Sequence, residues 1–255
     1  MKKAIHFILS ALALLFLFPV IETFFLSFYS NGGFTLKAWR ELFFDCFIFY
    51  PMFWNSVLYS SVITAGSLFI IVPGAFGLIM VKKKISKWIF FLYLVLMMMP
   101  LQVTLLPNYI GLRDLHLLDT GMCIILPMLF SVFGTVLMHQ YMENMEISQI
   151  EAARLETNSV FRVLLHIVMP QMKSCIYAVS FFTFIESYNM LEQPMLFLKN
   201  KRLQNLTVFI ADADQYTGDI LFPASVIFIV PVLLFYLLLH ESLQQNVCKL
   251  TGGCL

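Results

Sequence analysis

Six apolar runs, each about 20 residues or longer, constrain the fold of this 255-residue chain more than any other feature of its sequence. A helix that crosses a bilayer needs about 20 mostly apolar residues, because each residue adds about 1.5 Å along an apolar thickness of about 30 Å. The runs of this length are Ala4–Tyr29, Ser56–Val81, Trp88–Tyr109, Gly121–Tyr141, Cys175–Leu198 and Ile220–Leu239. We therefore predict an all-α membrane protein in which residues 1–255 form a single domain with six transmembrane helices, the third of them kinked by Pro100 and Pro107.

The composition agrees with this class and argues against others. Hydrophobic residues make up 60% of the chain and charged residues only 12%, whereas a soluble domain carries about 25% charged residues. The net charge of +1 offers no field for nucleic acid. The five cysteines and five histidines are dispersed along the chain, without the spacing of a metal site or a disulfide framework. We expect no metal, no cofactor and no nucleic-acid partner.

The first apolar run follows Lys2 and Lys3, as the apolar part of a signal peptide would. It is too long for that role and no small-residue cleavage site follows it, so we expect an uncleaved first helix. Ten of the sixteen lysines and arginines fall on the side of the termini, and Lys82, Lys83 and Lys84 share one short loop. By the positive-inside rule, the sequence predicts a multi-pass protein of the plasma membrane with both termini in the cytoplasm.

The segment Met142–Lys173 is far longer than a hairpin between two membrane helices needs. Ser148 followed by Glu151 has the pattern of a capping box, which predicts a helix start. The apolar periodicity of Val160–Val168 predicts a second short helix, which Pro170 ends. The residues alone leave two interpretations open: an amphipathic helix pair on the membrane surface, or an element that docks a cytoplasmic partner.

This segment resembles the EAA motif of ABC-importer permeases, in which E-A-A-x-x-D-G-A is followed by I-x-L-P. In that family the segment is the coupling helix, which sits in a cleft of the cytoplasmic ATPase. The resemblance assigns this contact to Glu151, Ala152, Ala153, Arg154, Glu156, Thr157 and Pro170. Glu156 and Thr157 replace the family's Asp-Gly. Because Thr157 disfavours the positive φ that glycine permits, the turn between the two helices can lie one residue later, at Asn158.

Four further segments resemble motifs of the carbohydrate-importer permeases, of the maltose and glycerol-phosphate type, in the same order along the chain. They are Phe53–Val57, Met97–Pro107, Asp119–Pro127 and Tyr188–Pro194, and together they cover about residues 53 to 210. The resemblance, to the shorter six-span members, implies one half of an alternating-access pathway for a sugar or oligosaccharide. It also implies a second homologous permease, a cytoplasmic ATPase dimer, an extracellular solute-binding protein and the lipid bilayer as partners.

No motif of an enzyme is present in the sequence. There is no G-x-x-x-x-G-K-[ST] to bind phosphates and no H-E-x-x-H or G-x-S-x-G. ATP hydrolysis is therefore expected in separate subunits. The alternatives are a permease for another solute, such as glycerol phosphate, and a membrane scaffold without transport activity.

Polar side chains interrupt the predicted fifth helix in its second half. They are Glu186, Tyr188, Asn189, Glu192 and Gln193. A carboxylate at the centre of a membrane helix costs about 2.5 to 3.5 kcal/mol on insertion scales, so such a group usually faces a cavity or a partner. We predict that these residues line the substrate pathway. The alternative for the two glutamates is the outer interface or a contact with the second permease.

Overall fold

The structure is a computed structural model of the chain, and it describes residues 2–30, 33–145, 157, 159–212 and 218–251. The described part is helical apart from one short antiparallel hairpin, β1–β2, in which Tyr29 pairs with Phe34 and Ser30 with Gly33. The elements before the central segment are α1 Lys2–Leu26, β1 Tyr29–Ser30, β2 Gly33–Phe34, α2 Lys37–Arg40, the π-helix η1 Glu41–Asp45, α3 Phe49–Met80, α4 Lys83–Met97, α5 Leu101–Asp114, α6 Met122–Met128 and α7 Val132–Glu143. Those after it are α9 Val160–Val163, the π-helix η2 Leu164–Val168, α10 Met169–Gln171, α11 Lys173–Tyr188, α12 Glu192–Phe197, the 3₁₀-helix η3 Lys201–Leu203, α13 Leu206–Ala211 and α14 Gly218–Thr251.

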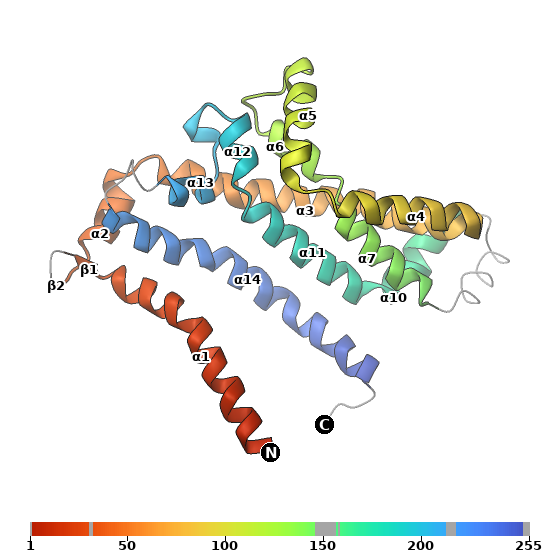
Figure 1. Cartoon of the computed structure of the whole chain (residues 1–255), viewed down its shortest axis with the longest axis horizontal. Coiled ribbons are helices and arrows are strands. Elements are labelled where there is room, and N and C mark those ends of the chain that lie inside the picture. Colours follow the sequence, from red (N-terminus) through yellow and green to blue (C-terminus); the bar gives the residue numbers. More distant parts are fainter. Residues whose placement is uncertain (1, 31–32, 146–156, 158, 213–217, 252–255) are drawn as a thin grey trace.

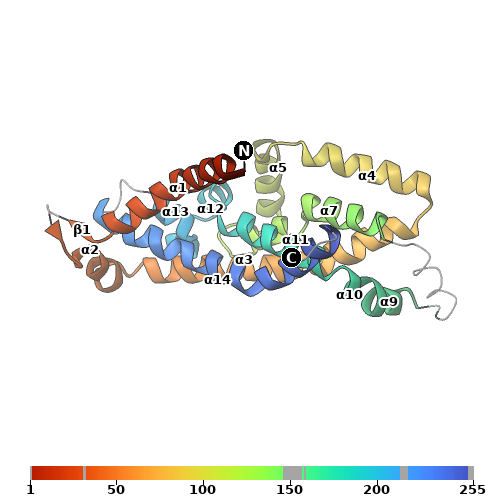
Figure 2. The ribbon, with the colours of Figure 1, turned by 90° about the horizontal axis from the view of Figure 1, so that it is seen from below.

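The long helices α3, α11 and α14 run alongside one another, and α1 diverges from α14 toward its N-terminus (Figure 1). Helix α7 packs against α3, α4 and α11. Helices α9 and α10 lie at one end of the molecule, and the β1–β2 hairpin and α2 lie at the opposite end (Figure 2). The group of α5, α6 and α12 projects to one side of this body (Figure 1). The predicted all-α membrane fold is confirmed.

Three clusters of buried apolar residues hold the helices together. The first joins the second half of α3 to α7, α9, η2 and α11, and its members are Ile71, Val72, Ala75, Phe76, Met138, Met142, Val163, Leu164, Val168, Met172, Cys175 and Val179. The second joins the start of α3 to η1, α13 and α14 around Leu42, Phe49, Met52, Leu206 and Phe209. The third joins α3 to α5, α6 and α12 around Ile63, Leu112, Cys123, Ile124 and Phe197.

Small residues bring the central helices close together. A buried stripe of hydroxyl residues follows α3, namely Ser56, Ser60, Thr64 and Ser67, and another follows α11, namely Ser180, Thr183 and Ser187. Such residues permit close approach of membrane helices. Gly134 of α7 has the same effect, because a Cβ there would lie 2.7 Å from Ile71 Cδ1 and 3.1 Å from Val179 Cγ1. The helices α3, α7 and α11 therefore form the compact centre of the fold.

Three of the six predicted spans contain a break in the helix. The run Gly121–Tyr141 is divided between α6 and α7, although together they form one apolar segment of 22 residues, Met122–Glu143. The run Trp88–Tyr109 is divided between α4 and α5, which meet at an angle of 98°. The sequence predicts a kink in this span at Pro100 and Pro107. The structure has a complete break at Pro100, which adopts an extended conformation with ψ of 146° and separates the two helices. Proline lacks the N–H that a continuous helix would need.

The run Cys175–Leu198 is also divided, because α11 ends at Tyr188 and α12 begins at Glu192. Thr207 Oγ1 donates to the carbonyl of Tyr188 over 2.9 Å, and Asn205 Nδ2 donates to the carbonyl of Met190 over 2.6 Å. Side chains near the start of α13 thus bind carbonyls that a continuing helix would use. The prediction of a single helix over this run is wrong for that reason.

Three helical segments of the described residues are long and apolar enough to cross a membrane, and their bounds are Phe49–Met80, Met122–Glu143 and Asp219–His240. Counting each bent pair, α4 with α5 and Val160–Gln171 with α11, as one span would give up to five. Leu12–Leu26 of α1 is a shorter apolar helix. The count of six spans stays a prediction.

Candidate functional site

Tyr188 lies at the end of α11 and is completely buried, with 0% of its surface exposed. Its ring stacks on Phe184 at a centroid distance of 5.7 Å and lies 4.7 Å from the ring of Phe228 on α14. The hydroxyl has no hydrogen-bond partner within the part of the chain that the structure describes. Tyr188 is thus a core residue that joins α11 to α14, and its side chain lines neither of the cavities described below.

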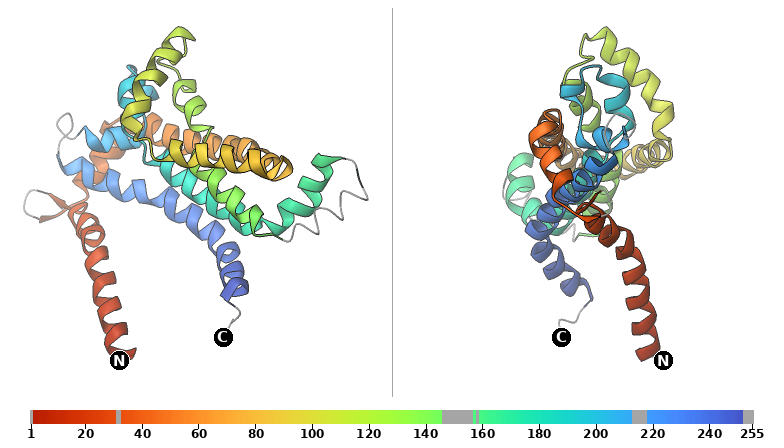
Figure 3. Two further views of the ribbon diagram at one scale, coloured as in Figure 1. Left: turned by 45° about the vertical axis from the view of Figure 1, so that its right-hand side comes forward. Right: turned by 90° about the vertical axis from the view of Figure 1, so that its left-hand side faces the viewer.

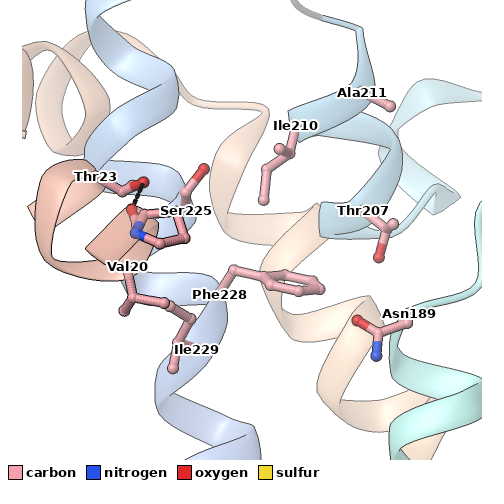
Figure 4. Close-up of a pocket in the computed structure, with 10 residues that line it drawn as sticks. Val20, Thr23, Asn189, Thr207, Ile210, Ala211, Ser225, Phe228 and Ile229 are labelled. Atoms are coloured by element: carbon pink, nitrogen blue, oxygen red, sulfur yellow. Dashed lines mark hydrogen bonds between the residues drawn. The ribbon is translucent and has the colours of Figure 1, made fainter. Parts of the chain in front are cut away.

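Asn189 follows Tyr188 and is exposed on a cavity of about 440 Å³ between α1, α13, α14 and the end of α11. Figure 4 shows its amide and the hydroxyl of Thr207 on one side of this cavity, with Thr23 and Ser225 on the other. Thr23 and Ser225 donate their hydroxyl protons to carbonyls of their own helices over 2.8 Å, and Thr207 donates to the Tyr188 carbonyl. The three hydroxyl oxygens remain available as acceptors.

Glu186 lies on a different cavity, of about 220 Å³, which α11 forms with the breaks in the neighbouring helices. The end of α4 contributes Met97, the residues between α6 and α7 contribute Ser131, and α11 contributes Thr183 besides Glu186. The Glu186 side chain is exposed. A carboxylate in an apolar helix therefore has access to a hollow rather than to the tightly packed interior.

Glu192 and Gln193 begin α12, beside α5 and α6. Glu192 Oε1 accepts a hydrogen bond from Gln102 Nε2 of α5 over 3.1 Å. Glu192 Oε2 and Gln193 Oε1 are buried and have no partner among the described residues. The structure therefore does not gather the five predicted pathway residues into one site: Tyr188 is in the core, and Asn189, Glu186 and the α12 pair occupy three separate surroundings.

A set of residues that the sequence did not single out individually holds the chain around this break in place; we term it the clasp. Asn55 Nδ2 donates to the carbonyls of Arg202 (2.7 Å) and Gln204 (3.1 Å), and Ser56 Oγ accepts from Leu206 N over 2.7 Å. The other members of the clasp are Tyr59, which donates to the Leu203 carbonyl, and Asp119, whose carboxylate accepts from the backbone N–H groups of Lys199 and Asn200 over 2.9 and 2.8 Å.

The clasp explains two of the motifs noted in the sequence. Asn55 and Ser56 belong to the segment Phe53–Val57, and Asp119 begins the segment Asp119–Pro127. Asp119 adopts a positive φ of 58°, which aspartate tolerates better than most residues. The motifs identified the segments that contain these residues. They could not identify the hydrogen-bond partners, which lie 80 to 150 positions away along the chain.

The predicted coupling segment is described in part. Glu151, Ala152, Ala153, Arg154 and Glu156 lie outside the described residues. Thr157 is described, and Ser159 caps α9 by accepting from the N–H of Arg162. The predicted second helix is present from Val160 to Gln171 and meets α11 at 83°. The prediction that Pro170 ends it is wrong by one residue, because Pro170 stands in the first turn of α10, where a missing N–H is tolerated.

The apolar face of this helix packs against the body of the protein. Val163, Leu164 and Val168 are buried in the cluster that includes Met138 and Met172, whereas Val160 is exposed. Apolar periodicity predicts one face made of Val160, Val163, Leu164, Ile167 and Val168. Three of these are buried and Ile167 is partly buried against the same cluster, so the helix is anchored to α3, α7 and α11.

Three helical segments of the described residues are long and apolar enough to cross a membrane, and the breaks after α4 and α11 lie beside polar residues. The family model of the binding-protein-dependent transport system inner membrane component matches residues 66–247, and this chain belongs to that family. The resemblance to ABC-importer permeases is therefore confirmed.

Relatives of known role are similar over most of the chain. It is 27% identical over 197 residues to the arabinooligosaccharides transport system permease protein AraQ of Bacillus subtilis (strain 168), covering 76% of this chain and 70% of the relative. It is 25% identical over 193 residues to the sn-glycerol-3-phosphate transport system permease protein UgpE of Brucella melitensis biotype 1, covering 73% and 68%. The crystal structure of a bacterial ABC transporter that imports the acidic polysaccharide alginate contains a chain with the same fold, with a TM-score of 0.82, 22% identity and coverage of 94% and 95%.

Proposed function

We propose that this chain is the permease subunit of an ATP-driven importer of a sugar or oligosaccharide and forms half of an alternating-access pathway. The observation that carries the proposal is the family match over residues 66–247, which includes both the coupling segment and the polar break after α11. AraQ supports a sugar as the solute, whereas UgpE keeps glycerol phosphate as the second candidate. Hydrolysis of ATP belongs to a separate ATPase dimer, and a second permease and a solute-binding protein complete the importer.

The proposed orientation in the plasma membrane places both termini and the α9–α10 helix in the cytoplasm. Two observations support it. The start of α1 and the end of α14 lie toward the same side of the molecule (Figure 3), and Lys82, Lys83 and Lys84 are exposed at the turn between α3 and α4. Exposed lysines in a short connection favour the cytoplasmic side.

In the proposed mechanism, closure of the ATPase dimer moves the coupling segment and through it α11. The contact residues are Glu151, Ala152, Ala153, Arg154, Glu156 and Thr157, with Pro170 in the helix that follows. That helix is packed into the same apolar cluster as α11 and is separated from it by a single bend. Because α11 ends at Tyr188, its displacement would reach the polar break and the two cavities beside it. Glu186, Asn189, Glu192 and Gln193 are the proposed pathway residues, and Tyr188 supports them from the core.

The coupling role can be tested by reversing one charge. Glu151→Lys should leave the permease folded and inserted, because a wrong charge at a helix start costs only about 0.3 to 1 kcal/mol. It should reduce the amount of ATPase that co-purifies with the chain, together with ATP-dependent uptake into vesicles. The matched control is Asp114→Lys, an exposed carboxylate at the end of α5, which should keep both. Full co-purification and uptake by Glu151→Lys would contradict the proposed ATPase contact.

A further inference from the structure

The buried side-chain atoms around the break after α11 that lack a partner among the described residues are the Tyr188 hydroxyl, which lies in the aromatic core, and two acceptor oxygens. Gln193 is only 4% exposed, yet its Oε1 has no partner among the described residues, and the same holds for Glu192 Oε2. Carboxylate and amide oxygens accept hydrogen bonds and cannot donate them. Buried acceptors without partners are costly, so these atoms are suited to a ligand that brings donors.

The cavity beside Asn189 adds three acceptor oxygens to the Asn189 amide, which can both donate and accept. The hydroxyls of Thr23, Thr207 and Ser225 already donate within the chain, which leaves their oxygens to accept. Phe228 places an aromatic ring between these groups (Figure 4). Hydroxyl-rich molecules supply donors in all directions and have apolar C–H faces that pack on such a ring.

The charges on these elements are of one sign. Glu186 and Glu192 are acidic, whereas the described residues of the two cavities, of α11 after Lys173, and of α12 and α13 include no lysine or arginine. The next basic residues along the chain line neither cavity and are exposed in the loop that the clasp holds; they are Lys199, Lys201 and Arg202. Pathways for anions are usually lined by arginine or lysine, which this region lacks.

We infer that the solute passing this chain is an uncharged, hydroxyl-rich molecule and not an anion such as a sugar phosphate or an acidic oligosaccharide. This inference rests on the proposed function and narrows its substrate class. It groups the chain with a permease for arabinooligosaccharides rather than with those for glycerol phosphate or alginate, although similarity alone does not separate them. An anion here would meet unpaired acceptors and two carboxylates.

The first experiment measures which class of solute is accumulated. The importer is purified through a tag on this chain with the subunits that accompany it, and is reconstituted into vesicles. An equimolar mixture of neutral pentose and hexose oligosaccharides, uronic-acid oligosaccharides and glycerol 3-phosphate is offered, together with whichever binding protein accompanies the importer. ATP-dependent accumulation is then measured by mass spectrometry.

Accumulation of neutral oligosaccharides alone is the expected result. Accumulation of either anion would overturn the charge inference while leaving the proposed function intact. ATP-dependent accumulation of none of the solutes, or absence of an ATPase from the purified complex, would count against the proposed function and against this inference with it.

Variants at Glu192 test whether this chain itself determines the preference for neutral solutes over anions. Glu192→Lys should lower uptake of the neutral solute about tenfold or more, since a donor replaces an acceptor. Glu192→Gln keeps the shape and one acceptor and should lose less. The control Asp114→Lys alters an exposed carboxylate beside Arg113 and should change uptake by less than about twofold.

Unfolding temperatures of the three purified variants separate a folding defect from a transport defect. If Glu192→Lys unfolds at a lower temperature than wild type, only the uptake by Glu192→Gln is used to judge the role of Glu192. If a well-folded Glu192→Lys takes up the neutral solute as fast as wild type, Glu192 does not contact the solute. Where Glu192→Lys does not fold, the same result for Glu192→Gln would lead to that conclusion.

Discussion

Both halves of α3 make apolar contacts, and the first half also makes hydrogen bonds to a loop that is distant in the sequence. In the first half, Asn55, Ser56 and Tyr59 make hydrogen bonds to backbone groups of the loop that follows α12. In the second half, from Ile71 to Phe76, the buried neighbours are apolar side chains of α7, η2 and α11. Hydrogen bonds fix donor and acceptor positions, whereas apolar contact requires only that volume be filled. The comparison predicts that chemical identity matters in the clasp and that volume matters in the apolar half.

Methionine is prominent in the apolar half and suits a region that transmits motion. Met138, Met142 and Met172 are almost completely buried where the α9–α10 helix meets α7 and α11. The methionine side chain is flexible and fills irregular space, so it can repack when its neighbours shift. The clasp by contrast fixes the backbone around the polar break. The molecule thus combines a deformable cluster near the coupling segment with a fixed geometry beside the candidate pathway.

Met138→Ala should lower the stability of the protein more than any substitution in the clasp. Met138 is completely buried on α7, and removing such a side chain leaves a cavity that costs about 2 to 5 kcal/mol. Met138→Leu is the matched control, because it keeps the volume and should cost less than about 1.5 kcal/mol. Unfolding free energies in mixed micelles measure both. Similar losses for the two variants would show that this half depends on side-chain identity, against the comparison.

Asn55→Asp tests the clasp with a change that preserves volume. The amide donates to two carbonyl oxygens, and a carboxylate would instead present acceptors to them. We expect a loss of about 1 to 3 kcal/mol, with faster hydrogen exchange of the backbone amides from Leu203 to Leu206. The control Asn144→Asp removes an exposed amide that donates to the Gln140 carbonyl and should cost less than about 0.5 kcal/mol. Unchanged exchange in Asn55→Asp would mean that the loop is held by other contacts.

The difference between the two halves also explains what could be predicted from the sequence. Apolar periodicity predicted that Val163, Leu164 and Val168 would share a buried face, because packing of this kind is encoded locally. The clasp could not be derived in this way, since Asn55 and its acceptors are separated by 147 and 149 positions. A resemblance could identify the segment that contains Asn55, but the partners became apparent only in the fold.

The end of α11 shows why the predicted fifth span was too long. Residues Met195–Leu198 are apolar and continue the hydropathy of the helix before them. Asn205 and Thr207, which bind the carbonyls at the break, come later in the chain and leave no local signal. The break at Pro100 was easier, because proline is a local signal. The sequence predicted a kink there, although its size of 98° depends on tertiary contacts.

Tyr188→Phe should have the smallest effect on stability of the substitutions considered. It tests the residue at which the polar break after α11 meets the apolar core. The Tyr188 ring stacks on Phe184 and is tilted against Phe228, and its hydroxyl is buried without a partner among the described residues. Replacing an unpaired buried hydroxyl by hydrogen keeps the ring contacts and removes a desolvation cost, so stability should stay within about 1 kcal/mol of wild type or rise.

Phe184→Leu is the matched control for this change, because it removes a stacked ring beside Tyr188 and should lower stability by about 1 to 3 kcal/mol. If the Tyr188 hydroxyl serves only the core, ATP-dependent uptake by Tyr188→Phe should equal that of wild type. A fall in uptake with unchanged stability would instead mean that the hydroxyl meets the solute in another state of the transport cycle. Tyr188 would then belong with Asn189 in the pathway, and the boundary between core and pathway would move one residue toward α11.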